Sequence, residues 1–413
     1  MWTMARRSLI LKAGLCGAVA AVVLTGGCSS SHSGKASVPA AKEAPVAEVP
    51  STVEHWGSFF GASKDVNYNL AISPAALTVP GAVAEIGTSN STQYALLTDG
   101  RLYAWGLGTE GQLGDGSLAN SFTRPVRVLF PRGVKIVSIP GDAMPFDAAL
   151  AIDADGNVWG WGLNGGDDFC LKDTRMYATP VKLPLSRVTA VAGASNHALY
   201  DADGTVYACG SNVVGDLGDG STQSSATPVK VAGIEGSVVT ALVASFANSG
   251  ALLSNGEYFD WGYNTWGELG DGQFQQSSDV PVRVHLPYPV IQVAQGGSIW
   301  HNGQTLVQLS NGSLWAWGAN FYGQLGNGST QSQASPVQFY PPAGVTYKML
   351  ATGAITSYAI STTGKVYAWG GSPVGQVGDK TKRTTLSPVR ITSGATMIST
   401  TANDVAVAIP ART

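Results

Sequence analysis

Short apolar runs separated by turn residues recur along the chain at a spacing of about 50 residues. The clearest copy, LWAWGANFYGQLGNGST, extends from Leu314 to Thr330; its apolar run ends in Trp-Gly and a Gly-rich loop follows. Four runs of strand length are predicted around it, at 290–294, 305–309, 313–317 and 336–339. A period of this length predicts a propeller or a solenoid rather than a row of separate domains.

Five further stretches repeat the same pattern. They begin at Leu102, Val158, Val206, Tyr258 and Val366, and the copy at Val158 is the most divergent. Before the third run of each repeat stands Asp-Gly, Asn-Gly or Thr-Gly, and the first two supply the positive φ angles that a two-residue hairpin turn needs. From the Trp position to the next Pro the distance is 19 or 20 residues in each repeat. The pattern therefore predicts tight antiparallel strands.

The two ends of the chain carry complementary halves of a repeat. Residues 397–409 supply a first and a second strand, whereas Val53–Gly57 and Ser73-Pro74 supply a third and a fourth. Six full repeats and these halves predict an all-β fold, a seven-bladed β-propeller of four-stranded antiparallel blades over residues 52–410. Its last blade is closed by strands from both termini, which pairs edges that would otherwise be exposed.

The consensus of the repeats, DGxVYAWGxNxxGQLGDG…PVxV, resembles the repeat of the regulator of chromosome condensation (RCC1) family over roughly residues 52–410. The resemblance implies a seven-bladed propeller. The resemblance does not imply one particular function, because members of that family include nuclear nucleotide-exchange factors, photoreceptors, ubiquitin-ligase modules and secreted bacterial inhibitors of β-lactamase.

The amino terminus has the features of an export signal. Arg6, Arg7 and Lys12 precede an apolar run over 13–24 that is too short to span a bilayer comfortably. The run ends in LTGGC, which resembles a bacterial lipoprotein signal, so residues 1–28 are predicted to be a signal ending at a lipidated Cys28. Ordinary cleavage and release is the alternative, and the stretch from Arg6 also resembles a twin-arginine signal.

Residues 29–51 are predicted to be a flexible tether, because Ser, Ala, Pro, Lys and Glu predominate there and few large apolar side chains are present. A lipid anchor followed by a tether predicts an exported bacterial protein attached to the membrane at the cell envelope, or secreted if Cys28 is not lipidated. The expected partner is an unknown protein or large ligand at that envelope.

Charge and composition narrow the partner classes. Charged residues are 12% of the chain, against about 25% in a typical soluble domain, and the formal net charge is −3. No basic stripe is apparent that could neutralise phosphates, so no nucleic acid partner is expected. Export argues against a nuclear role, so no small GTPase is expected either.

Strand alternation places the loops between first and second strands and between third and fourth strands on one face of the ring. The two residues before the loop Gly vary between repeats, and aromatic residues occur there at Phe59, Phe60, Trp266, Phe321 and Tyr322. The first-to-second loops of the same face add Phe146, Phe246, Trp300 and His301. Two insertions, at 140–148 and 296–304, fall on that face as well. Aromatic residues on loops of a rigid scaffold predict a binding face, whereas folding of these side chains over the blades is the alternative.

Other candidate residues favour structural roles. The Trp residues of the Trp-Gly steps recur with the repeat, so they are expected to pack between blades. His197 has no ring of equivalent imidazoles and is expected to be structural. No motif for catalysis, a metal or a cofactor stands out, and Asp153–Asn157 lacks the bidentate Glu of a calcium loop. Cys170 and Cys209 fall in adjacent blades; an exported compartment allows a disulfide, although the splay of the blades could hold the two residues too far apart.

The favoured function is therefore an exported, lipid-anchored, protein-binding scaffold that is not an enzyme. Two alternatives stay open. One is a secreted inhibitor of β-lactamase or of a similar envelope enzyme. The other is a hydrolase or lyase of envelope polymer, which would need clustered carboxylates or His at the central pore; the dispersed Asp and Glu residues do not suggest this.

Overall fold

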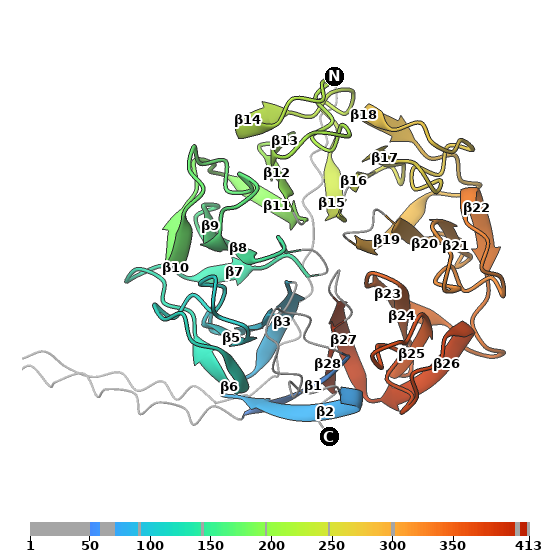
Figure 1. The fold of residues 1–413 in the computed structure, drawn as a ribbon, viewed down its shortest axis with the longest axis horizontal. Coiled ribbons are helices and arrows are strands. Elements are labelled where there is room, and N and C mark those ends of the chain that lie inside the picture. Colours follow the sequence, from blue (N-terminus) through green and yellow to red (C-terminus); the bar gives the residue numbers. More distant parts are fainter. Residues whose placement is uncertain are drawn as a thin grey trace, which may run out of the picture. The chain divides into compact units, whose positions relative to one another are not determined.

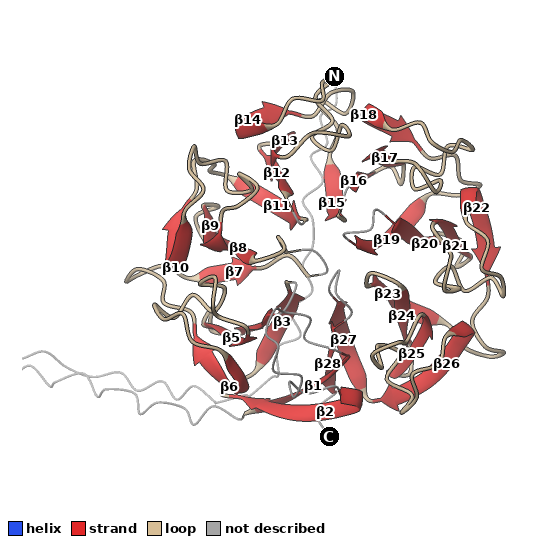
Figure 2. Cartoon of the chain, in the orientation of Figure 1, coloured by secondary structure: helices blue, strands red, loops and turns tan. Residues whose placement is uncertain are grey.

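The computed structural model describes residues 50–57, 71–89, 92–141, 144–194, 196–246, 248–298, 302–400 and 405–410. The predicted export signal, with Cys28, and the predicted tether up to residue 49 lie outside these residues. The described part consists of strands and loops (Figure 2). Within it, we find no helix with the length and apolar character needed to span a membrane.

Strands in the described residues assemble into four-stranded antiparallel sheets, as predicted (Figure 1). Blade 1 contains β3 (Val83–Thr88), β4 (Thr92–Leu97), β5 (Leu102–Gly106) and β6 (Ser121–Arg127). Blade 2 contains β7 (Ile136–Ser138), β8 (Ala148–Asp153), β9 (Val158–Leu163) and β10 (Met176–Lys182). Blade 3 contains β11 (Val188–Gly193), β12 (His197–Ala202), β13 (Thr205–Gly210) and β14 (Ser225–Lys230).

The next three blades follow the same order. Blade 4 contains β15 (Val239–Ala244), β16 (Asn248–Leu253), β17 (Tyr258–Gly262) and β18 (Ser278–Arg283). Blade 5 contains β19 (Val290–Ser298), β20 (Asn302–Leu309), β21 (Leu314–Gly318) and β22 (Gln333–Phe339). Blade 6 contains β23 (Tyr347–Thr352), β24 (Thr356–Ser361), β25 (Lys365–Gly370) and β26 (Thr385–Ser393). The first strand of each blade lies nearest the centre of the ring (Figure 1).

A further sheet joins the two ends of the chain in the order β2-β1-β28-β27. Its strands are β1 (Ser51–Gly57), β2 (Ala71–Val79), β27 (Ala395–Thr400) and β28 (Val405–Pro410). The strands β1 and β28 pair antiparallel, with Glu54 opposite Ala408 and Gly57 opposite Val405. The two half-repeats therefore meet as the sequence predicts, and the ring combines six blades of consecutive strands with this closing sheet.

Blade 5 shows how local sequence sets the strands. The turn between β20 and β21 uses Gly312 at a φ of 83°, and Asn311 Oδ1 accepts the Ser313 N–H at 3.0 Å. Buried and half-buried residues alternate at the start of β21, in keeping with one strand face turned to the neighbouring blade. The insertion predicted at 296–304 lengthens the hairpin, since Gly296 pairs with Gln304 and Gly297 with Gly303.

Recurring Trp residues connect neighbouring blades. In five of the six Trp-Gly steps, the indole N–H donates to a backbone carbonyl in the loop between the third and fourth strands of the preceding blade, at 2.8 to 2.9 Å. The corresponding loop before Trp105 lies outside the described residues. The pairs are Trp56 with Gln376, Trp161 with Gln112, Trp261 with Asp216, Trp317 with Glu268 and Trp369 with Gln324. These Trp side chains are at most 1% exposed, so the predicted packing role is confirmed. We call each such contact a Trp latch.

A glycine lies two residues after the accepting carbonyl of each Trp latch, and a larger residue there would clash with the indole ring. A Cβ atom on Gly326 would lie 2.7 Å from Trp369 Nε1, and the corresponding closest distances at Gly114, Gly218, Gly270 and Gly378 are 2.6 to 2.8 Å. Distances this short are not tolerated between non-bonded heavy atoms. These glycines also adopt positive φ angles, which favour glycine over other residues.

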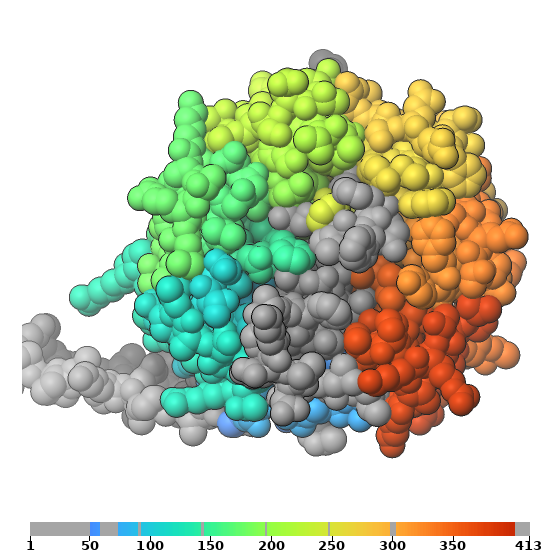
Figure 3. Space-filling view, in the orientation of Figure 1, coloured from blue at the N-terminus to red at the C-terminus, as the bar shows by residue number. Residues whose placement is uncertain are grey.

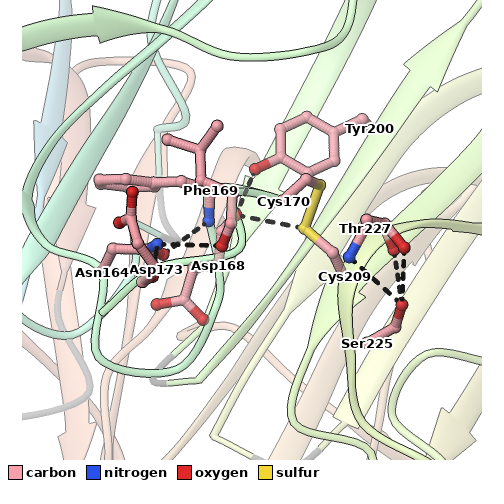
Figure 4. The surroundings of a disulfide bond; sticks show 10 residues. Asn164, Asp168, Phe169, Cys170, Asp173, Tyr200, Cys209, Ser225 and Thr227 are labelled. Atoms are coloured by element: carbon pink, nitrogen blue, oxygen red, sulfur yellow. Dashed lines mark hydrogen bonds between the residues drawn. A yellow bond between two sulfur atoms is a disulfide. The ribbon is translucent and has the colours of Figure 1, made fainter. Parts of the chain in front are cut away.

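Cys170 and Cys209 occupy the Gly and Trp positions of this contact between blades 2 and 3, and they form a disulfide (Figure 4). Their Cα atoms are 5.4 Å apart, which resolves the alternative left open by the sequence in favour of a bridge. The thiol-derived sulfur of Cys209 also lies 3.4 Å from the Asp168 carbonyl oxygen, the equivalent of the carbonyl that accepts the indole N–H elsewhere. A covalent bond thus replaces a Trp latch at this junction.

Candidate functional site

The loops between third and fourth strands are built on a buried polar residue. In blade 5, Asn320 Oδ1 accepts the Leu325 N–H at 2.9 Å, and its amide donates to the carbonyls of Ser329 and Gln331. The same loop rests on the next blade, because Gly328 N–H donates to the Leu386 carbonyl at 3.3 Å. These contacts fix the loop backbone, which leaves the two residues before the loop Gly to face outward.

Trp266 and Phe321 are brought together from adjacent blades by this arrangement. Their ring centroids are 4.7 Å apart and the rings meet edge to face, with an interplanar angle of 86°. Trp266 is 37% exposed, Phe321 43% and Tyr322 40%. We call these three residues the aromatic cluster. They were predicted as members of one binding face, and the structure places them in contact or adjacent along the chain.

The backbone beneath the aromatic cluster is held by the side chain that follows the loop Gly. Glu268 Oε2 accepts the Trp266 N–H at 2.7 Å, and Gln324 Oε1 accepts the Tyr322 N–H at 2.9 Å. Both acceptor side chains are buried. Because these hydrogen bonds order the loop in the free protein, less conformational entropy is lost when a partner binds.

Burial raises the pKa of Glu268 to about 8, although backbone N–H groups at Trp266, Glu268 and Gly303 lower it in part. The equivalent positions in blades 2 and 3 are Asp168 and Asp216, and burial raises the pKa of each well above its usual value. Sequence reasoning did not recognise this group of acids. The available signal was the replacement of Gln by Asp or Glu in three consecutive repeats.

The other predicted face residues are half-buried or fall outside the described part. Phe146 and Phe246 are half-buried, in the loops that precede β8 and β16. Phe59, Phe60, Trp300 and His301 fall outside the described residues, so their predicted roles stay predictions.

The insertion at 140–148 packs against neighbouring blades. A Cβ on Gly87 in blade 1 would lie 2.8 Å from Met144 Cε, and one on Gly193 in blade 3 would lie 2.4 Å from Pro145 Cδ. Ser399 of the closing sheet donates to the Gly141 carbonyl. Met144 is 5% exposed. This part of the insertion is therefore a packing element between inner strands, which the sequence alone assigned to the binding face.

His197 is structural in its surroundings. It is fully buried, its Nε2 lies 2.8 Å from Ser249 Oγ, and Ser249 donates to the Asp216 carbonyl. Burial lowers the pKa of His197 to about 4, so the imidazole is neutral at physiological pH.

Taken together, these features define a repeat-built β-propeller whose loops present variable side chains on a rigid ring. The RCC1 repeat (Regulator of chromosome condensation) matches residues 99–140, 203–246, 255–299 and 311–360. The chain belongs to the RCC1-like repeat family. The matched segments leave out 141–202, which contains the divergent copy and Cys170.

Relatives and solved structures agree with this membership. The chain is 29% identical to the ultraviolet-B receptor UVR8 of Arabidopsis thaliana over 67% of its length. It is 28% identical to the mitochondrial RCC1 domain-containing protein RUG3 of the same plant over 79%. The match spans 62% of each relative. Human WBSCR16 superimposes with a TM-score of 0.73 at 18% identity, covering 87% of this chain and 99% of that one.

The expected exclusion of small GTPases and nucleic acid is wrong. Prp20p from Saccharomyces cerevisiae shares the fold, with a TM-score of 0.72 at 20% identity over 88% of this chain and 92% of that one. Its structure is described together with its binding to Gsp1p, a small GTPase, and to histones. The fold shared with Prp20p therefore gives no ground for the exclusion that was drawn from the lack of a basic stripe and from the export signal.

Proposed function

We propose that this propeller is a protein-binding scaffold that engages its partner through the face formed by the loops between third and fourth strands. The observation that carries the proposal is the aromatic cluster: Trp266, Phe321 and Tyr322 are exposed side by side on backbone that is held in place from below. Trp and Tyr are the residue types most enriched among energetically dominant interface positions. The class of partner is left open, and proteins of the kind that Prp20p binds fall within it.

The location that fits this proposal is the cell envelope. Residues 1–28 would direct export, Cys28 would carry the lipid, and the following Ser-, Ala- and Pro-rich residues would connect the anchor to the propeller. Incorporation of radiolabelled palmitate into the full chain, compared with Cys28→Ala, tests the anchor. Equal labelling of the two proteins would remove the anchor from the proposal and leave the binding face unaffected.

The binding face is tested by capture from envelope extract. Partners captured by the full chain are identified by mass spectrometry, and their affinity is then compared between the parent and the triple variant Trp266→Ala, Phe321→Ala and Tyr322→Ala. We expect a loss of 100-fold or more, because each buried aromatic anchor contributes roughly 2 kcal/mol.

A matched control variant is Tyr340→Ala, which removes a 67% exposed aromatic side chain directly after β22, away from these loops. It should bind like the parent. If the triple variant retains its affinity, the proposed face is incorrect.

A further inference from the structure

Blade 6 carries an exposed group of cations in its loop between third and fourth strands. Lys380, Lys382 and Arg383 are all exposed, and none of them has an ion-pair partner among the residues that the structure describes. We call these three residues the basic loop. At the equivalent positions, blade 5 has Gly328, Thr330 and Gln331, and none of these is charged.

Lys380 stands at a backbone position that favours glycine. Its φ is 68°, whereas the equivalent residues of blades 1, 3, 4 and 5 are Gly116, Gly220, Gly272 and Gly328, all with positive φ. A non-glycine residue in this region carries a modest energetic cost. The cation is thus retained where backbone geometry alone would favour Gly.

The blade that carries the basic loop contacts the loop of blade 5 that carries Phe321 and Tyr322. Leu386 contacts the loop of blade 5, because a Cβ on Gly323 would lie 2.5 Å from Leu386 Cδ2. Arg383 precedes Leu386 by three residues, so their Cα atoms are separated by at most about 11 Å. Tyr322 also reaches blade 6, since its Cβ lies 3.2 Å from where a Cβ on Gly371 would stand. Blades 5 and 6, orange and red, adjoin along one side of the ring (Figure 3).

The carboxylate nearest in sequence does not neutralise the basic loop by ion pairing. Asp379 Oδ1 accepts the Thr381 N–H at 2.9 Å and the Thr381 hydroxyl at 2.7 Å, and so shapes the turn. The chain as a whole has a net charge of −3. Three cations without an ion-pair partner among the described residues, on the blade next to the exposed aromatic side chains, are therefore a local exception to the net negative charge. They complement a partner whose apolar anchor is flanked by carboxylates.

We propose that the aromatic cluster and the basic loop together bind an acidic protein segment in which an aromatic or aliphatic side chain is flanked by clustered Asp and Glu residues. The inference rests on the proposed binding face and specifies its partner. The apolar side chain of the segment would contact the Trp266–Phe321 pair, and its carboxylates would face Lys380, Lys382 and Arg383.

A single-stranded nucleic acid is the weaker fit to the same surface. Binding of that kind uses a basic groove that tracks many phosphates, with aromatic faces on which bases stack. Here three cations are grouped in one loop, and Trp266 and Phe321 meet edge to face rather than forming a parallel platform. The geometry favours a short segment with one apolar anchor.

The test is selection of a random 12-residue peptide display library on the immobilised full chain and on the triple variant Lys380→Glu, Lys382→Glu and Arg383→Glu. Peptides selected on the parent should be enriched in Asp and Glu beside an aromatic or aliphatic residue. Synthetic copies should bind the charge-reversed variant about tenfold more weakly or worse, and raised salt should weaken their binding to the parent.

Matched controls separate this inference from the proposed function. The variant Arg124→Glu, Arg127→Glu and Arg132→Glu reverses three exposed cations of blade 1 and should select the same peptides as the parent. Equal peptide composition on the parent and the charge-reversed variant would overturn the acidic-segment proposal, as would tighter binding of a 20-nucleotide single strand than of any selected peptide. If the aromatic variant loses its captured partner but the charge-reversed variant keeps it, the proposed function stands and this inference fails.

Discussion

Replacing Glu268 by Gln should remove a pH-dependent destabilisation from blade 4. Glu268 occupies the position of Gln112, Gln324 and Gln376 in blades 1, 5 and 6, and in all four loops the side-chain oxygen accepts a backbone N–H two residues earlier. Gln keeps this acceptor and the shape of the side chain while removing the ionisable group. The substitution therefore isolates the effect of charge.

The stability that Glu268 contributes decreases as the pH rises, because its pKa is higher in the folded protein than in the unfolded chain. Burial raises the pKa of Glu268 from 4.5 to about 8 in the folded protein, so the folded state retains a proton that the unfolded chain releases above pH 4.5. The free energy of unfolding contributed by this group is complete below pH 4.5, falls as the pH rises towards 8, and levels off above that. Over the full window the loss is roughly 5 kcal/mol, because each pH unit of difference corresponds to about 1.4 kcal/mol.

Guanidinium unfolding of the full, oxidised chain, followed by Trp fluorescence at pH 5, 6, 7, 8 and 9, measures this effect. The stability difference between Glu268→Gln and the parent should be small at pH 5 and should grow to several kcal/mol at pH 9. The reciprocal variant Gln324→Glu should introduce the opposite trend into blade 5. A difference that stays constant across this pH range would refute the reasoning, since the side chain would then not change its protonation on unfolding.

Two further predictions concern the junctions between blades. Reduction of the disulfide, or Cys209→Ser, should lower the free energy of unfolding by roughly 2 to 4 kcal/mol, whereas the double variant Cys170→Gly with Cys209→Trp should regain stability under reducing conditions by restoring a Trp latch. Thermal unfolding with and without reductant checks this, and a double variant no more stable than Cys209→Ser would contradict the equivalence of the two contacts. Gly326→Ala should lower the unfolding midpoint far more than Gly344→Ala: both glycines have positive φ, but a Cβ on Gly326 meets Trp369 whereas one on Gly344 meets nothing within 4 Å. Similar unfolding midpoints for the two variants would mean that the destabilisation comes from backbone conformation alone, and not from a clash with Trp369.

Much of the fold could be predicted because each repeat contains the sequence signals for its own strands. Period-two apolar runs, Asn-Gly or Asp-Gly turns and a constant Trp-to-Pro distance are local signals, and they repeat often enough to average out divergent copies. The pairing of β1 with β28 followed from counting the strands missing at each end. The extent of the β19–β20 hairpin was less predictable, since residues 296–298 include two glycines and carry little strand signal.

The candidate site was only partly predictable, because its components depend on distances between blades. The aromatic residues at 266, 321 and 322 could be assigned to one face from strand direction, but the Trp266–Phe321 contact depends on how closely two blades approach. For the same reason the disulfide stayed undecided: blades splay outward, yet Cys170 and Cys209 lie where neighbouring blades touch. The burial of Glu268 could be recognised only from the structure, since a Glu in a Gly-rich surface loop ordinarily has an exposed side chain.

The protonation of Glu268 connects the stability of the scaffold to its proposed binding face. The aromatic cluster spans two blades whose loops hold the backbone differently: a titratable side chain accepts the Trp266 N–H, whereas the amide oxygen of Gln324 accepts the Tyr322 N–H. Ionisation of a buried carboxylate is unfavourable. Opening of the loop of blade 4 would expose the Glu268 carboxylate to water and remove this cost. As the pH rises towards 8, Trp266 should therefore lose its fixed position before Tyr322 does. A partner that depends on Trp266 would then bind less tightly in the parent at high pH, and Glu268→Gln would keep that affinity.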